Sequence, residues 1–365
     1  MSEHEPITID GSQGEGGGQI VRTSLALSCI TGRPLSMIKV RAGRPKPGLG
    51  HQHLTSIRAA QRICSAQVTG ASLGSKQFTF EPGPVQAGAY EFDVGTAGST
   101  TLVLQTIALP LALSSGDSHV TITGGTHNPM APCYEYLETV WVPLCKQLNL
   151  HVSLSLTRAG FYPVGGGKIT AEIRGIGSPG ALTACRFAER GEVLSIDGFS
   201  AVARLPRSIA ERQARQAAER LDASGTAHDP ITLRTLGASS PGTVLFLHCR
   251  SAYGTAGFFG LGARGKPAEQ VADEAVDQLQ DYLGRDGALD PHAADQLILP
   301  LALAPGASCF TTTRVTDHLV THIEVLRQFL DRRIELTGSP NEYGRVNIDA
   351  ILLDESADRS EVDRR

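Results

Sequence analysis

The chain has 365 residues and a formal net charge of −4, with 33 Lys and Arg residues against 37 Asp and Glu residues. This length suggests about two domains, and a hydrophobic content of 41% is enough for a sizeable core. The acidic balance excludes a protein that coats nucleic acid over its whole surface, because bulk phosphate binding needs a basic face. A local basic pocket that holds one nucleic-acid end is still compatible with this charge.

The cysteines and the apolar stretches indicate a cytoplasmic globular protein. The seven cysteines are scattered and form no CxxC pair, which is typical of a reducing compartment rather than of a disulfide framework or a zinc site. The first residues have neither the basic nor the apolar region of a signal peptide. The longest apolar stretch, 102–113, is shorter than the roughly 20 residues of a membrane span. The charged tail, 351–365, is predicted to be disordered.

An internal repeat is the strongest structural signal in the sequence. The tripeptide Leu-Ala-Leu begins at Leu25, Leu111 and Leu301, and each copy precedes a glycine that can end a helix. A strand-like run, a turn and a second helix follow each copy. The first two copies are 86 residues apart and the last two are 190 apart, so about one hundred extra residues separate the last two.

The sequence therefore predicts an α/β (α+β) protein of three βαβαββ repeats with an inserted, smaller α/β domain. The repeat domain is predicted to be discontinuous, over 1–175 and 285–350, with the insert over 176–284. Within the insert, Gly260 begins a match to the GxxxxGK phosphate-binding loop. However, this match continues into Pro267, where such a loop needs Ser or Thr, so Pro267 is predicted to begin a helix instead.

Two sets of polar residues occupy equivalent positions in the three repeats. If the repeats pack with pseudo-symmetry, each set could converge near the axis, but equivalent positions could also merely cap or pack in the same way. One set lies inside the first helix of each repeat, and the other lies at the start of the second helix. The sets are Gln19, Gln105 and Asp295, and His53, Tyr136 and His318.

Two local motifs are typical of phosphate binding. The glycine-rich loop 11–19 leads into a helix, which lets backbone N–H groups approach a phosphate, although a tight turn also needs glycine. Arg22 follows one turn later, and a strand is followed by Arg41, Arg44 and Lys46. Arginine forks match phosphate geometry, and a solvated surface loop is the equally weighted alternative.

His318 lies at the start of the last predicted helix. The positive end of a helix lowers the pKa of a histidine and favours the neutral, nucleophilic imidazole. Local sequence alone favours the alternative that this is an ordinary histidine at a helix start.

Taken together, several segments resemble the RNA 3′-terminal phosphate cyclase family, in its catalytic type 1 branch. The resemblance extends from about residue 7 to 348 and is weaker in the insert. It implies three βαβαββ repeats, as in enolpyruvyl transferases, with a smaller inserted domain, in agreement with the repeat spacing. The segments are DGSQGEGGGQIVR (10–22), RAGRPKPGL (41–49), GGTHNPMAP (124–132), GFYPVGGGK (160–168), ADQLILPLAL (294–303) and TDHLVTHI (316–323).

The resemblance also implies a reaction. The family converts an RNA 3′-phosphate to a 2′,3′-cyclic phosphate with ATP, through a histidyl-AMP enzyme and an RNA(3′)pp(5′)A intermediate, and needs Mg²⁺ or Mn²⁺. His318 matches the adenylated nucleophile, and Glu15 is a candidate metal ligand. The other matching positions fall at the nucleotide site (Glu15, Gln105, Pro132, Tyr136, His292 and Asp295) and at the RNA-end site (Arg22, Arg41, Arg44, Gln52 and His53).

Three positions depart from the family pattern. His292 replaces an aromatic residue, His322 replaces an Asn, and Ala159 replaces a basic residue or His, which puts the fine nucleotide contacts in doubt. The expected partners are RNA 3′-phosphate ends with little sequence preference, because an aromatic content of 5% argues against reading bases by stacking. A homodimer is left open.

Two other functions were weighed. One is a non-catalytic cyclase-like protein of rRNA processing and ribosome assembly, against which His318, Glu15 and Asp295 argue. The other is an enolpyruvyl transferase, which usually carries six such repeats and lacks the insert.

Overall fold

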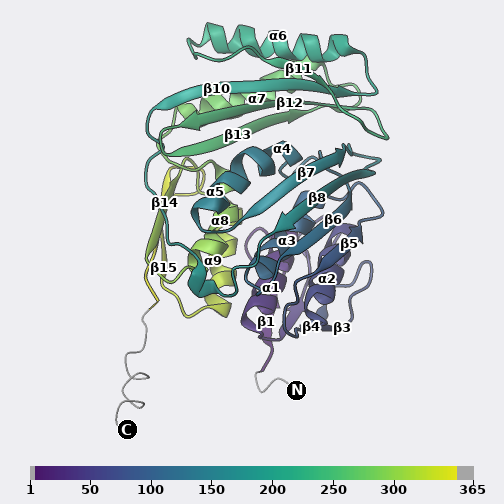
Figure 1. Cartoon of the computed structure of the whole chain (residues 1–365), viewed down its shortest axis with the longest axis vertical. Helices are drawn as coiled ribbons and strands as arrows, with labels where there is room; N and C mark the ends of the chain where they lie inside the picture. The colour runs from purple at the N-terminus through teal and green to yellow at the C-terminus, as the bar shows by residue number, and fades with distance from the viewer. Residues whose placement is uncertain (1–4, 352–365) are drawn as a thin grey trace.

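Three four-stranded sheets in the molecule share one topology (Figure 1). The computed structural model describes residues 5–351. In each sheet the first strand runs parallel to the second, and the fourth strand lies antiparallel between the second and the third. Each sheet comes from one βαβαββ unit, so the three predicted repeats are confirmed.

The bounds of the repeat elements follow. The first repeat contains β1 (Ile7–Asp10), α1 (Gly18–Thr31), β2 (Leu35–Ile38), α2 (His51–Cys64), β3 (Gln67–Thr69) and β4 (Phe78–Glu81). The second contains β5 (Ala89–Asp93), α3 (Thr100–Ala112), β6 (Ser118–Gly124), α4 (Tyr134–Tyr136), the π-helical turn η1 (Leu137–Trp141), α5 (Val142–Gln147), β7 (Val152–Arg158) and β8 (Gly167–Ile173). The third contains β9 (Arg186–Phe187), α8 (Pro291–Leu303), β14 (Ser308–Thr312), α9 (Asp317–Phe329), β15 (Ile334–Thr337) and β16 (Gly344–Ile348). A short 3₁₀ turn, η2 (Pro179–Ala181), precedes β9.

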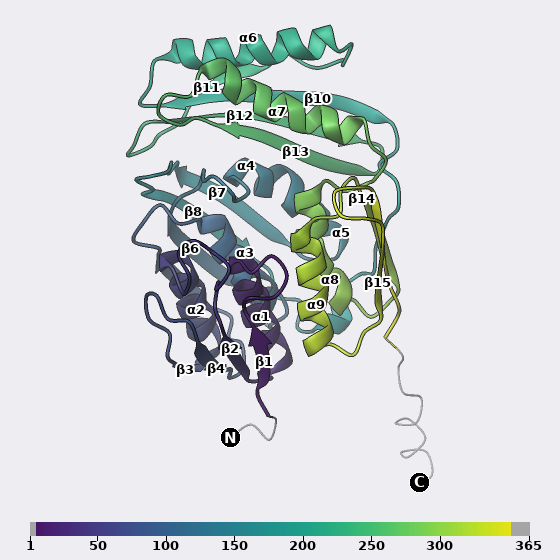
Figure 2. The same ribbon diagram turned by 180° about the vertical axis from the view of Figure 1, so that it is seen from behind.

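The helices of the repeats pack against one another at the centre of the molecule (Figure 2). Helix α1 contacts α2, α3 and α9, and α8 contacts α9. This position explains why α1 is buried along most of its length, from Gln19 to Cys29, and carries small and aliphatic residues on nearly every face. It ends at Gly32, which adopts the left-handed conformation with φ 70° and donates its N–H to the Ser28 carbonyl. Helix α1 thus contacts helices of all three repeats.

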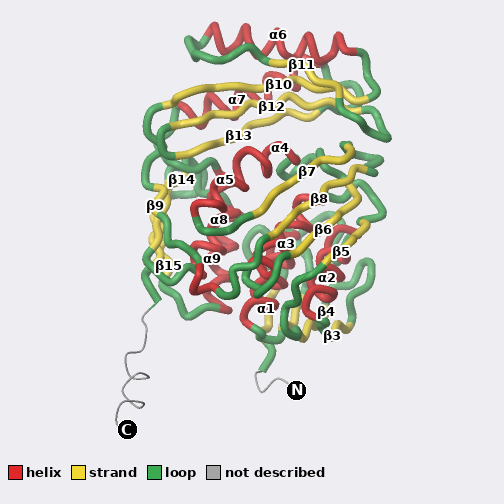
Figure 3. Tube along the Cα trace, viewed as in Figure 1, coloured by secondary structure: helices red, strands yellow, loops and turns green. Residues whose placement is uncertain are grey.

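The inserted segment forms a fourth sheet of its own, in the order β11-β10-β12-β13 (Figure 3). One face packs against α6 and α7, with Ile196 and Leu247 in that core. The opposite face, which carries Phe199 and Phe246, belongs to the main core, and β13 contacts η1 and α5. The elements are β10 (Val193–Ala203), α6 (Arg207–Ala223), β11 (Thr232–Thr235), β12 (Gly242–Ser251), β13 (Gly254–Leu261) and α7 (Ala268–Leu283).

The boundary of the insert differs from the predicted one at its N-terminal side. Strand β9 lies within the predicted insert, 176–284, but pairs in parallel with β14 in the sheet of the third repeat. We therefore propose that the inserted domain begins after Phe187. Pro267 caps α7 and Gly260 lies in β13, so the GxxxxGK match is not a phosphate-binding loop. Except for Ile351, the tail predicted to be disordered lies outside the described residues.

Among the described residues, no helix is both long and apolar enough to cross a membrane.

Candidate active site

Five helices begin at one cleft with a volume of about 830 Å³. They are α1, α2, α3, α8 and α9, which come from all three repeats. The first turns of α1, α2 and α3 carry no acidic residue, so no carboxylate of the same turn opposes an anion at these helix N-termini. Helix N-termini attract anions, and this convergence creates a site suited to several phosphates.

Most of the predicted site residues line this cleft. Tyr136 is the exception, because it is fully buried and donates its hydroxyl to Asp290 Oδ1 over 2.8 Å. Its ring meets the exposed His292 edge-on, with centroids 5.7 Å apart, so Tyr136 lies behind the cleft wall and not in it. The eleven that line the cleft are Glu15, Arg22, Arg41, Arg44, Gln52, His53, Gln105, Pro132, His292, Asp295 and His318.

His318 lies in the first turn of α9, after the N-cap Thr316, whose hydroxyl accepts the Leu319 N–H. Its side chain is half exposed, and its Nδ1 lies 3.5 Å from Glu15 Oε2. Burial lowers the pKa of His318, and the charges of Arg22 and Arg44 lower it further, against the opposing effect of Asp295 and Asp317. The imidazole is therefore neutral at neutral pH and has a free lone pair.

Glu15 links the glycine-rich loop to helix α9. Its backbone N–H donates to Thr321 Oγ1 over 2.9 Å, and its carboxylate pairs with Arg44. Glu15 Oε2 is buried and has no hydrogen-bond partner among the described residues. A buried carboxylate oxygen of this kind fits a ligand of a divalent cation, which prefers oxygen donors and keeps phosphates in its coordination shell.

The cationic wall of the cleft comes from the first repeat. Burial lowers the pKa of Arg22 to about 10, so this guanidinium still carries its charge. Arg41 donates to the Gly48 carbonyl over 2.9 Å, which fixes its direction. Burial, followed by the charges of Arg22 and Arg41, lowers the pKa of His53 to about 3, and His53 Nδ1 accepts the Gly50 N–H. His53 is thus a neutral hydrogen-bonding group beside two fixed charges.

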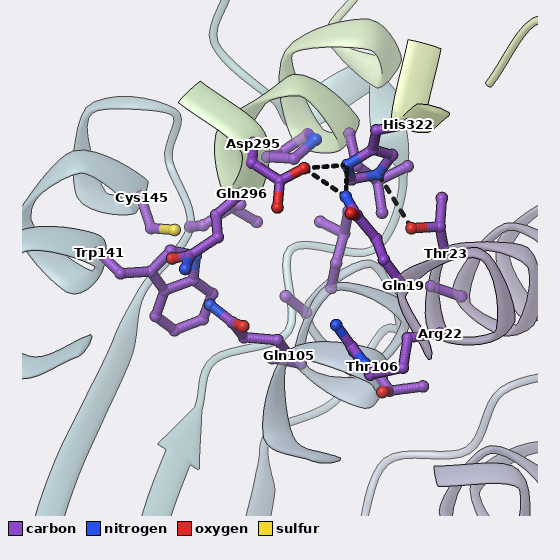
Figure 4. A pocket seen from close by; sticks show the side chains of 17 residues that line it. Gln19, Arg22, Thr23, Gln105, Thr106, Trp141, Cys145, Asp295, Gln296 and His322 are labelled. Atoms are coloured by element: carbon purple, nitrogen blue, oxygen red, sulfur yellow. Dashed lines mark hydrogen bonds and ion pairs between the residues drawn. The ribbon is translucent and has the colours of Figure 1, made fainter. Parts of the chain in front are cut away.

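One of the two predicted polar sets converges as expected. Gln19, Gln105 and Asp295 line both the cleft and a small inner cavity of about 80 Å³ behind it (Figure 4). Gln19 donates to Asp295, and His322 lies between Asp295 and Thr23, at 3.2 Å from each. Burial acts to raise the pKa of Asp295, but the interactions with His322, above all its hydrogen bond, and the hydrogen bond from Gln19 lower the pKa overall.

Comparisons with known proteins agree with this geometry. A family model described as RNA 3′-terminal phosphate cyclase matches residues 13–336. The chain belongs to this family. Proteins of that name from Pseudomonas fluorescens and Koribacter versatilis are 42% and 44% identical to it, over 96% and 92% of this chain and 99% and 93% of theirs. One from Methylococcus capsulatus is 42% identical over 94% of this chain and 96% of its own length.

The departures from the family pattern lie in three different environments. His292 is exposed at the start of α8, whereas His322 is buried in the hydrogen-bond network around Asp295. Ala159 is buried and donates its N–H to Gly237 of the insert. Of the three, His292 is the one that faces the cyclase cleft.

Part of the cleft wall is not among the residues predicted from the sequence. Residues 96–99, which precede α3, line the cleft, as does Gln296. Ser99 donates its N–H to Gln52, which ties the first repeat to the second. The repeat pattern could have predicted this part of the wall. The glycine-containing stretch 95–99 precedes the first helix of the second repeat, as the glycine-rich loop 11–19 precedes the first helix of the first repeat.

Proposed function

We propose that this protein converts the 3′-phosphate of an RNA end into a 2′,3′-cyclic phosphate at the expense of ATP. The observation that carries the proposal is His318, whose pKa is lowered by burial and neighbouring charges at a helix N-terminus in an anion-binding cleft. A neutral imidazole among phosphate-binding groups suits nucleophilic attack on phosphorus.

In the first step, His318 Nε2 attacks the α-phosphorus of ATP. Nδ1 lies 3.5 Å from Glu15 Oε2, on the side of the carboxylate, which leaves Nε2 as the nitrogen that attacks the nucleotide. The N–P bond forms as the bond to pyrophosphate breaks. Arg44 and the helix N-termini offset the charge that develops on the phosphate oxygens.

The next two steps join and then cyclise the RNA end. An oxygen of the RNA 3′-phosphate attacks the phosphorus of histidyl-AMP, which breaks the N–P bond, frees His318 and forms RNA(3′)pp(5′)A. The vicinal 2′-hydroxyl then attacks the 3′-phosphorus and releases AMP. Arg22, Arg41 and His53 are proposed to bind the terminal phosphate, with Gln52 holding the loop before α3 against them.

The nucleotide is proposed to lie toward α3 and α8. Gln105, Asp295, Pro132 and His292 line this part of the cleft, and Tyr136 supports His292 from behind. A divalent cation, Mg²⁺ or Mn²⁺, would be held by Glu15 and would offset phosphate charge when bound. The unpartnered Glu15 Oε2 supports this assignment.

A turnover assay with defined RNA ends tests the proposal. With ATP and Mg²⁺ or Mn²⁺, an oligonucleotide with a 3′-phosphate should acquire a phosphatase-resistant cyclic end, whereas a 3′-hydroxyl end should not react. Equal ATP consumption with both ends would contradict the proposal. No reaction with either end, and no adenylated protein, would favour the non-catalytic relative.

A further inference from the structure

Two large apolar side chains are exposed at the rim of the cleft, and a third is exposed close to them in the sequence. Met130 is 90% exposed, Tyr162 64% and Val164 60%. Met130 and Tyr162 line the cleft itself, and Val164 follows two residues later. Most large apolar side chains of the described residues are buried, so an exposed group beside an active site indicates a binding surface.

The loops that carry these side chains are firmly held. The N–H groups of Thr126 and His127 both donate to the Gly160 carbonyl, which joins the Met130 loop to the Tyr162 loop. The ring of Phe161 stacks on His127 with centroids 4.6 Å apart, and it packs against Gly242 of the insert so closely that a Cβ there would overlap it. Tyr162 is therefore presented to solvent by a fixed backbone.

The charge of the cleft identifies the class of ligand. Arg22, Arg41 and Arg44 form its cationic wall, and Arg158 donates to the Gly166 carbonyl of the hairpin that carries Tyr162. An aromatic face beside fixed cations is the arrangement that binds single-stranded nucleic acid, where the cations hold phosphates and the ring stacks a base. A polyanion with flat apolar groups fits this rim better than an apolar peptide would.

We propose that Tyr162, flanked by Met130, stacks one of the last two bases of the RNA whose 3′-phosphate the arginines hold. This inference rests on the proposed function. Stacking accepts every base, since each base has a π-face, so the platform strengthens RNA binding without sequence preference. A single stacking ring is compatible with the expected weak sequence preference.

Tyr162→Ala and Tyr162→Trp test the proposal on 3′-phosphate RNAs that either keep all bases or carry a base-free ribose at the last or the penultimate position. Tyr162→Ala should raise the KM for intact RNA roughly 5- to 150-fold, the range that a stacked base contributes. Tyr162→Trp should have the same KM for intact RNA as wild type. With the base missing at the stacked position, wild type and Tyr162→Ala should have the same KM.

Two controls separate this proposal from the proposed function. Tyr253 is 63% exposed in the insert and lines a different groove, so Tyr253→Ala should leave the KM for RNA unchanged.

The second control is label transfer from ATP to the protein without RNA, which should be the same in wild type and Tyr162→Ala. Loss of this transfer in Tyr162→Ala would show that the ring contributes to ATP binding and would contradict the proposal that it stacks an RNA base. An equal penalty on intact and base-free RNAs would overturn it too. If wild type cyclises no RNA end, the proposed function fails first.

Discussion

At the scale of single residues, the reactivity of His318 depends on the charges around it. Partial burial and the cations Arg22 and Arg44 lower its pKa, while Asp295 and Asp317 counteract them. Only the neutral ring can attack phosphorus, so the fall of the adenylation rate at acid pH should reflect the pKa that these opposing charges give to His318.

The rate of protein adenylation should rise with pH along a limb whose midpoint lies below pH 6.5, the ordinary pKa of histidine. Arg44→Gln should move this midpoint up because a nearby cation is removed. Asp317→Asn should move it down because an anion is removed. Single-turnover label transfer over a range of pH measures both shifts, and midpoints that move in the same direction would refute the assignment.

His53 should make the folded state sensitive to acid. Its folded pKa of about 3 lies below the ordinary 6.5, so below pH 6.5 the unfolded chain takes up a proton that the folded chain does not. Stability should therefore fall as pH falls, by about 1–2 kcal/mol at pH 5 on account of this residue.

Urea unfolding at neutral pH and pH 5 measures this loss. His53→Gln should reduce the loss by that amount, and His51→Gln, an exposed position on the same helix, is the matched control. An unchanged pH dependence in His53→Gln would mean that another group carries the effect.

At the scale of elements, the glycine-rich loop positions Glu15 beside His318. Gly14 has φ +54°, and a Cβ there would overlap the Thr321 hydroxyl that accepts the Glu15 N–H. The loop thus depends on glycine both for its conformation and for its close approach to α9.

Gly14→Ala should slow adenylation about 10- to 100-fold because it displaces Glu15. Left-handed strain should also cost about 1–2 kcal/mol of stability. Gly265→Ala is the control, because Gly265 has φ +82° with open space around it, so strain alone applies there. The adenylation rate of Gly265→Ala should equal that of wild type. Equal rates for both variants would show that Glu15 does not depend on this loop.

The helices and strands also show how much of the fold could be predicted from the sequence. The Leu-Ala-Leu anchors predicted α1, α3 and α8 because their burial pattern is local. Strand β13 was missed because Gly254, Gly257 and Gly260 are typical of a loop. In the structure, a Cβ on Gly257 would lie 2.9 Å from Val140 and 3.1 Å from Tyr136, so this glycine serves close packing on η1.

Contacts between segments far apart in the chain were the other features that the sequence could not predict. Strand β9 has two residues and pairs with β14 more than one hundred residues later, which no local pattern can reveal. Tyr136 shares a repeat position with His53 and His318 but is diverted into a buried hydrogen bond with Asp290. The cleft residues could be predicted from the family resemblance, and the wall at 96–99 could have been predicted from its position before the first helix of the second repeat.

At the scale of the whole molecule, the insert and the repeats share one core. Phe199 and Phe246 of the insert sheet belong to the same apolar cluster as Tyr136 and Val140 of the second repeat. Separating them would expose this surface, so the insert should not unfold alone.

Unfolding in urea should therefore be a single transition. The sole tryptophan, Trp141, lies in η1 beside the insert, so its fluorescence and the far-ultraviolet circular dichroism of the whole chain should give coincident curves. Phe246→Ala should shift both curves together, by about 3–5 kcal/mol. A circular-dichroism change that precedes the fluorescence change would contradict this, since it would mean that the insert unfolds independently.

The central claim is that His318 is the residue that becomes adenylated. Incubation with α-labelled ATP and Mg²⁺ or Mn²⁺ should produce a covalent AMP adduct that is acid-labile and alkali-stable, as a phosphoramidate is. The adduct should map to the peptide containing His318, persist in His53→Ala and be absent from His318→Ala. Full adduct formation by His318→Ala, together with its loss in His53→Ala, would contradict the account and assign the nucleophile to His53.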